Sequence, residues 1–255
     1  MKRSSRARIG ATATVSVLSL ALITGCGGGS DEDSEDTKES TGASASTGTA
    51  TKALSAAELK KKLLTPSDVP GYETSGTADT LPKAKSEVKS AKTECAPIAY
   101  AMAGLPPGDT DATASTLLTK SDTSASPSPG ADITFNIEMT VVGLSSYEGD
   151  GAAKTLKAVS DAVAACGSGF GATLEGESQK ITKVTAGKSA AKGDESVAFT
   201  VDADAEGEKA TFNVEVVRVG ATVATFYTVD FAALGSGKAA AVPTALLDAQ
   251  TAKLK

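Results

Sequence analysis

The chain has 255 residues and a formal charge of −6, and 40 % of its residues are apolar. It contains no histidine, which excludes catalytic triads built on an imidazole base and removes the usual ligand of zinc and iron. The surplus of acids argues against nucleic-acid binding, because an acidic surface repels the phosphate backbone. We therefore expect no cofactor and no nucleic-acid partner. Without tryptophan, the core must be a lean one.

The first 25 residues have the composition of a lipoprotein signal peptide. An uncharged stretch over 11–23, too short to span a bilayer comfortably, follows the basic residues Lys2, Arg3, Arg6 and Arg8. The stretch ends in Ile23-Thr24-Gly25-Cys26, which resembles the lipobox of bacterial lipoproteins. In that family the cysteine is lipidated and the signal is cut before it. We predict the same for Cys26, the alternatives being a plain secretory signal or an uncleaved anchor helix.

Residues 26–54 predict a disordered tether. Glycines over 27–29 are followed by five acids within 31–36 and then by Ser, Thr, Ala and Gly. Such a segment cannot bury enough apolar surface to offset the entropy of ordering it. The sequence therefore predicts a signal peptide over 1–25, a lipidated linker over 26–54 and one domain over 55–255. Cleavage removes four basic residues and no acid, so the formal charge changes from −6 to −10. The mature protein is expected to be lipid-anchored at the extracytoplasmic face of the cell membrane.

The first half of the predicted domain contains two helices and a strand. Ser55 and Glu58 form a capping-box pattern at the start of the first helix, which Pro66 ends. A short helix is expected over 97–103, between Pro97 and Gly104. Apolar and polar residues then alternate over 131–142, which predicts a half-buried strand.

The second half predicts a helix followed by a run of strands. Apolar residues recur on one stripe over 151–166, as in an amphipathic helix. Strand candidates follow near 172–184, 195–203, 209–219 and 221–231, and short glycine-bearing turns join the last three. A final helix is expected over 238–253, with Pro243 as the alternative first turn. Strands in runs, with helices at the ends, indicate an α+β fold.

The cysteine count agrees with an exported protein. Once Cys26 is lipidated, Cys95 and Cys166 remain as an even pair. In an oxidising compartment such a pair predicts a disulfide, the alternative being two buried free thiols.

The order of features also carries a family resemblance. The segment Leu-Leu-Thr-Pro-Ser-Asp-Val-Pro-Gly-Tyr over 63–72 follows the first helix, and Tyr147 precedes the Ala-rich helix that ends at Cys166. Over residues 54–255 this order resembles the PknH-like extracellular sensor domains and related actinobacterial lipoproteins. The resemblance implies a twisted antiparallel sheet packed by helices, and an envelope ligand or protein partner of unknown identity. The kinase sensor of that family has two disulfides, whereas this chain can form one.

An acidic turn gives a calcium candidate. Asp202, Asp204 and Glu206 stand at alternate positions before Gly207, like the opening of a calcium loop. Asn213 stands where the bidentate glutamate should be, and a strand pattern follows instead of a helix. The alternative interpretation is an acidic hairpin turn.

Two further patterns define the alternative functions. Ser189 and Lys192 have the spacing of a Ser-Lys nucleophile pair, but its partner motifs are missing, so a Ser/Lys hydrolase is a remote alternative. The chain is therefore predicted to be a non-enzymatic binding or sensing lipoprotein. The alternative is a carrier of a lipid or glycolipid. In a carrier, some of the apolar strand residues would line a ligand cavity instead of forming an ordinary core, namely Phe199, Val201, Phe212, Val214, Phe226 and Phe231.

Overall fold

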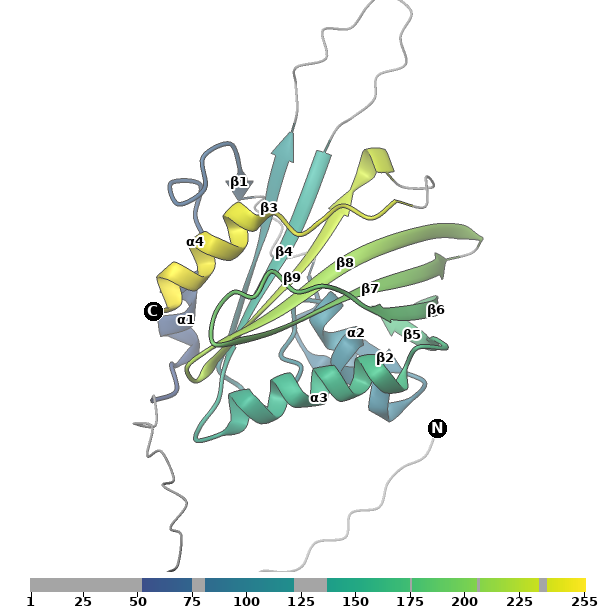
Figure 1. The fold of residues 1–255 in the computed structure, drawn as a ribbon, viewed down its shortest axis with the longest axis horizontal. Coiled ribbons are helices and arrows are strands. Elements are labelled where there is room, and N and C mark those ends of the chain that lie inside the picture. The colour runs from purple at the N-terminus through teal and green to yellow at the C-terminus, as the bar shows by residue number, and fades with distance from the viewer. Residues whose placement is uncertain (1–51, 75–80, 122–136, 175, 206, 234–237) are drawn as a thin grey trace, which may run out of the picture. The chain divides into compact units, whose positions relative to one another are not determined.

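The computed structural model describes residues 52–255, except 75–80, 122–136, 175, 206 and 234–237 (Figure 1). The predicted signal peptide, the lipidation site Cys26 and nearly all of the predicted tether lie outside the described residues. So do Glu206 and residues 131–136 of the predicted strand.

The described residues form one antiparallel sheet with four α-helices, which confirms the α+β class. The nine strands are arranged in the order β1-β3-β4-β9-β8-β7-β6-β5-β2. Their bounds are β1 Glu73–Thr74, β2 Val88–Ser90, β3 Thr113–Ser121, β4 Ile137–Ser146, β5 Phe170–Leu174, β6 Glu177–Ala186, β7 Glu195–Ala205, β8 Glu208–Val219 and β9 Thr222–Asp230. The helices are α1 Ala56–Lys62, α2 Ala96–Met102, α3 Gly151–Ala165 and α4 Thr244–Leu254. Short 3₁₀ turns lie at Lys85–Glu87, Thr93–Cys95 and Phe231–Ala233.

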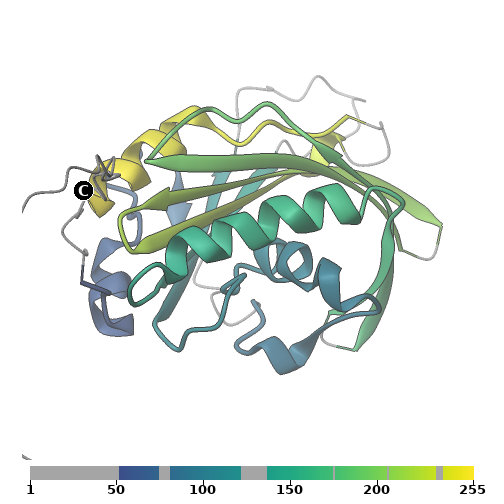
Figure 2. The same cartoon turned by 60° about the horizontal axis from the view of Figure 1, so that its bottom comes forward.

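Helices cover both faces of the sheet (Figures 1 and 2). Helices α2 and α3 pack on one face, over a core that includes Phe199 and Val214. Helices α1 and α4 pack on the other, over a core that includes Phe226 and Leu246. Because side chains alternate between the two faces of a strand, each central strand supplies both cores.

Strand β4 shows the consequence of this double coverage. Residues 140–146 are all buried, so the prediction of a half-buried strand over 131–142 is wrong for residues 140–142. The polar Thr140 is accommodated because its hydroxyl hydrogen-bonds the hydroxyl of Thr228 on β9, at 3.0 Å. Pairing of two buried hydroxyls offsets the cost of removing them from water.

Several element boundaries also differ from the prediction. The strand expected near 172–184 is two strands, β5 and β6, because the chain reverses at Gly176 with a φ of +92° that glycine adopts without strain. The last helix begins at Thr244 after Pro243, so the alternative first turn is the right one. The capping box of α1 is confirmed, with Ser55 and Glu58 each bonding the other's backbone N–H.

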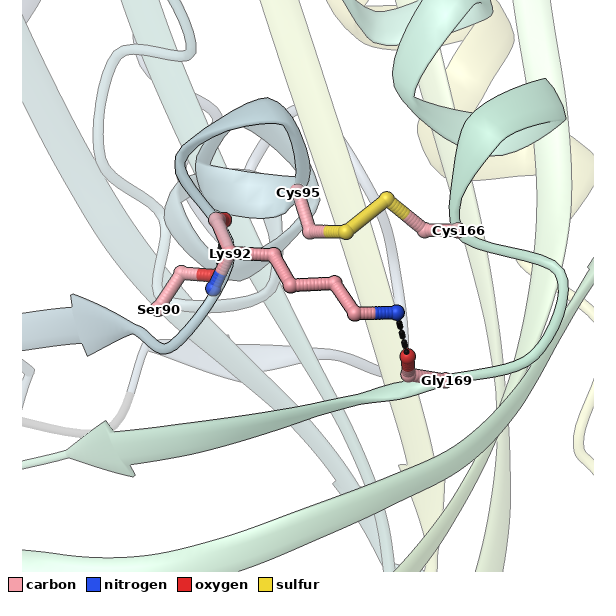
Figure 3. The surroundings of a disulfide bond; sticks show 5 residues. All are labelled: Ser90, Lys92, Cys95, Cys166 and Gly169. Atoms are coloured by element: carbon pink, nitrogen blue, oxygen red, sulfur yellow. Dashed lines mark hydrogen bonds between the residues drawn. A yellow bond between two sulfur atoms is a disulfide. The ribbon is translucent and has the colours of Figure 1, made fainter.

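The predicted disulfide is confirmed (Figure 3). Cys95 lies at the start of α2 and Cys166 directly follows α3, and their Cα atoms are 5.9 Å apart. Neither cysteine is exposed to solvent. Beside the bond, Lys92 Nζ donates a hydrogen bond to the carbonyl of Gly169 at 2.9 Å. The disulfide therefore fixes α2 and α3 together over one face of the sheet.

Candidate functional site

The end of α2 lies very close to the sheet, because two glycines face each other there. A Cβ on Gly143 of β4 would lie 2.5 Å from the carbonyl oxygen of Gly104, and a Cβ on Gly104 would lie 2.7 Å from Val141. Gly104 also has a φ of +68°, which lets the chain turn sharply after the helix. Absence of side chains at these two positions therefore lets the turn after α2 lie directly on β4.

A small apolar pocket lies where this short helix leaves part of the sheet uncovered. Its volume is about 90 Å³. Met102 and Ala103 come from the end of α2, Ala172 from β5, Ile181 from β6 and Tyr227 from β9. Most of the remaining lining is apolar as well, namely Val88, Ala99, Phe170 and Leu174 beside Thr173 and Gln179. We call this the α2 pocket.

Tyr227 is the most informative residue of the α2 pocket. Its ring packs against Phe212 with ring centroids 5.2 Å apart. Burial raises the pKa of its phenol, and no hydrogen bond to another described residue contributes to that shift. By contrast, the hydroxyl of Tyr147 donates to Ser145 Oγ at 3.0 Å and accepts from the amide of Gly108. Tyr227 is partly buried, and its hydroxyl is not enclosed and bonds no described residue, so it can donate a hydrogen bond to a group bound in the pocket.

The arrangement can bind an apolar group that carries a hydrogen-bond acceptor. Apolar walls favour hydrocarbon, and the single phenol would fix its orientation. The volume is below the roughly 300–1,000 Å³ typical of pockets that enclose a whole ligand. The α2 pocket therefore fits one end of a chain or one ring.

The residues of the calcium prediction lie in the β7–β8 hairpin. Asp202 Oδ1 accepts a hydrogen bond from Thr211 Oγ1 at 2.9 Å, and Asp204 Oδ1 accepts from the amide of Gly207 at 2.8 Å. Across the described ranges, no three Asp, Glu, Cys or His side chains gather as a metal site. Since Glu206 is outside those ranges, calcium binding stays a prediction.

Ser189 and Lys192 have separate partners in the loop between β6 and β7. Ser189 Oγ donates to Glu215 Oε1 at 2.9 Å and also bonds the hydroxyl of Ser196. Lys192 Nζ forms an ion pair with Asp248 of α4 at 2.5 Å. The proton acceptor that this geometry gives Ser189 is a carboxylate, not the lysine.

The apolar candidates for a cavity are divided between several environments. Phe199, Val201 and Val214 are buried in the core beneath α2 and α3, and Phe226 is buried in the core beneath α1 and α4. Phe212 contacts the α2 pocket through Tyr227, and Phe231 is 45 % exposed.

Sequence reasoning missed Tyr227 as a site residue. It lies in a strand of apolar and threonine residues, and nothing in that pattern distinguishes it from a core residue. The lining of the α2 pocket also comes from separate stretches of the chain, which only the sheet order brings together.

Comparison with known proteins finds similarity to a solved structure. No family model matches the chain, and no curated protein does. The crystal structure of the extracellular domain of PknH from Mycobacterium tuberculosis is similar, with a TM-score of 0.47 and 14 % identity. The match covers 80 % of this chain and 95 % of that one. Within the part of the chain that the structure describes, no helix is long and apolar enough to cross a membrane.

Proposed function

We propose that this chain is a non-enzymatic lipoprotein, anchored to the cell membrane through Cys26, whose domain binds an envelope ligand or protein partner on the extracytoplasmic side. The signal-like residues 1–25 support the export. The disulfide between Cys95 and Cys166 supports an oxidising location, because such bonds persist there and are reduced in the cytosol. The observation that carries the binding role is the apolar α2 pocket with the hydroxyl of Tyr227, which bonds no other described residue, in its lining.

The chemistry of the α2 pocket defines the class of ligand. An acyl chain next to an ester or amide carbonyl would place hydrocarbon against Met102 and Ile181 and an acceptor near Tyr227. A lipid or glycolipid carrier is the second candidate, because the lining is apolar. With about 90 Å³, the pocket must widen before it can enclose a whole lipid. A module that binds one end of a ligand needs no such change, and we favour it.

Fluorine NMR tests this proposal on residues 27–255, the mature chain without its lipidated cysteine and called the mature chain in the solution experiments below. The chain has four tyrosines, so fluorotyrosine labelling gives four resonances that single Tyr→Phe variants assign. The probe is 1-decanoylglycerol below its aggregation concentration, which offers an acyl chain and a neutral ester. We expect a saturable shift of the Tyr227 resonance, while the other three tyrosines, which do not line the pocket, keep their resonances in place.

Variants make the test specific. Tyr227→Phe keeps the ring and removes the donor, so affinity should fall about 2- to 10-fold, as for the loss of one hydrogen bond. Ala172→Phe fills the pocket and should abolish the shift. Tyr100→Phe is the matched control, because Tyr100 is not part of the pocket lining. Absence of any shift, or equal binding by the filled variant, would refute the proposal.

A further inference from the structure

A second groove lies on the opposite face of the sheet from the α2 pocket. It has a volume of about 310 Å³ and lies between the loop over 187–193, strands β7 and β8, and residues 241–242 before α4. Glu215 pairs directly with Phe226 on β9, whereas Tyr227 pairs with Val214. Directly paired residues share a face, so Glu215 lies on the α4 side and Tyr227 on the α2 side. We call this second site the Glu215 groove.

Glu215 is a buried carboxylate with one unused oxygen. It is 5 % exposed. Its Oε1 accepts from Ser189 Oγ at 2.9 Å and from the amide of Ala190 at 2.8 Å. Its Oε2 accepts from no described residue, yet it is not enclosed, because Gln250 Oε1 is the only fully enclosed side-chain oxygen without a partner in the described ranges. Oε2 is therefore accessible, and the groove is the space that Glu215 lines.

No cation of the described chain neutralises this carboxylate. The nearby Lys192 is paired with Asp248, and Arg218 is paired with Asp194 and Glu195. Lys188 lines the groove but is exposed and forms no ion pair with Glu215 among the described residues. A buried carboxylate is normally stabilised by a cation or by several hydrogen bonds. Glu215 has two hydrogen bonds, both to Oε1, so the atom left for a cationic ligand is Oε2.

Both walls of the Glu215 groove are fixed to the sheet. Ala191 has a left-handed φ of +55°, and its amide donates to Ser189 Oγ at 3.0 Å, which holds the serine against Glu215. On the other wall, Asn213 Nδ2 donates to the carbonyl of Ala240 at 2.9 Å. Thr200 Oγ1 in turn donates to Asn213 Oδ1 at 2.8 Å. The carboxylate is thus held in place before any ligand arrives.

We propose that the Glu215 groove binds a primary ammonium group, with Glu215 Oε2 as its acceptor. A divalent metal would need several oxygen ligands, and no such cluster exists in the described ranges. A guanidinium prefers to bond both carboxylate oxygens, but Oε1 already accepts two hydrogens and its lone pairs are filled. An ammonium needs only one oxygen. Solvent weakens the repulsion between the exposed Lys188 and this ligand more than it weakens the attraction of the buried carboxylate.

The test is a ¹H–¹⁵N NMR titration of the mature chain with n-butylammonium chloride. The amides of Ala190 and Ala191 report directly on the Glu215 cluster. We expect both amides to shift saturably with n-butylammonium, and neither to shift saturably with n-butanol, which has the same shape and no charge. Equal shifts with the alcohol, or no saturable shift with the ammonium, would overturn the proposal. This test needs only the wild-type protein.

Two variants separate a binding role from a structural one. Glu215→Gln keeps an amide oxygen that can accept the bonds from Ser189 and Ala190, but removes the charge. Ammonium affinity should therefore fall tenfold or more, while a dispersed spectrum shows that the domain is folded. Glu195→Gln is the matched control, since Glu195 is an exposed carboxylate near the same loop. Unchanged ammonium affinity of Glu215→Gln would show that the carboxylate only holds the loop.

Discussion

Removal of the disulfide is the perturbation whose magnitude the structure defines best. Cys95 and Cys166 are separated by 71 positions in the sequence. Closing a loop of this length removes entropy from the unfolded chain worth about 4 kcal/mol at 25 °C. Because neither cysteine is exposed, alanine is the better replacement, as serine would bury an unpartnered hydroxyl. The double variant Cys95→Ala and Cys166→Ala should therefore lose a large share of the 5–15 kcal/mol typical of a domain.

Urea unfolding of the mature chain, followed by circular dichroism, measures this loss. With a denaturant slope of about 2 kcal/mol per molar urea, a loss of about 4 kcal/mol lowers the midpoint by roughly 2 M. Reduced wild-type protein is the matched control and should unfold near the midpoint of the double variant. If the double variant unfolds within about 0.3 M of the oxidised wild type, the reasoning from loop entropy is wrong for this fold.

Three further predictions concern anchoring, acid stability and packing. Cys26→Ser should move the protein from the membrane fraction to the soluble fraction and remove the acyl mass, which fractionation and intact mass spectrometry check. Lys253 holds the pKa of Asp68 at about 2. Asp68→Asn should therefore cost up to about 1 kcal/mol at neutral pH in urea unfolding. That cost should fade as the pH falls from about 4 to about 2, because a carboxylate with a lowered pKa stabilises the fold above its unfolded pKa and loses this contribution as it is protonated in the folded state. Gly143→Ala should cost about 1–3 kcal/mol in thermal unfolding, whereas Gly167→Ala, with ordinary space around its Cβ, should cost far less.

Local signals explain what the sequence could predict. The helix that begins after Ser55 was predictable because a capping box is written in consecutive residues. The helix over 151–165 has a regular apolar stripe, and the hairpin strands β7 to β9 are joined by tight turns. The disulfide followed from counting cysteines in a chain predicted to be exported. For the helices and the hairpins, a short stretch of sequence contains the whole signal.

Long-range contacts explain the errors. Strands β1 and β2 have two and three residues, and only pairing with β3 and β5 makes them strands. Strand β3 mixes threonine, serine and leucine without a clean alternation, since its partners rather than its sequence define it. The burial of β4 on both sides depends on helices that come from both ends of the domain.

The two candidate sites were hidden for the same reason. Tyr227 and Glu215 stand out because the Tyr227 hydroxyl and Glu215 Oε2 have no hydrogen-bond partner among the described residues. Whether a partner is present depends on neighbours far along the chain. In sequence, Tyr227 belongs to an ordinary strand, and Glu215 has the appearance of a solvent-facing strand residue. Burial beside residues 241–242, which precede α4, and the loop over 187–193 makes Glu215 exceptional.

Native mass spectrometry of the mature chain, exported and purified without refolding, tests the central claim most directly. The claim is that the α2 pocket binds an apolar group in the cell envelope. We predict a wild-type population that carries an additional mass extractable into organic solvent, and its absence from Ala172→Phe, where the pocket is filled. A ligand-free wild type, or the same additional mass on both proteins, would contradict the claim.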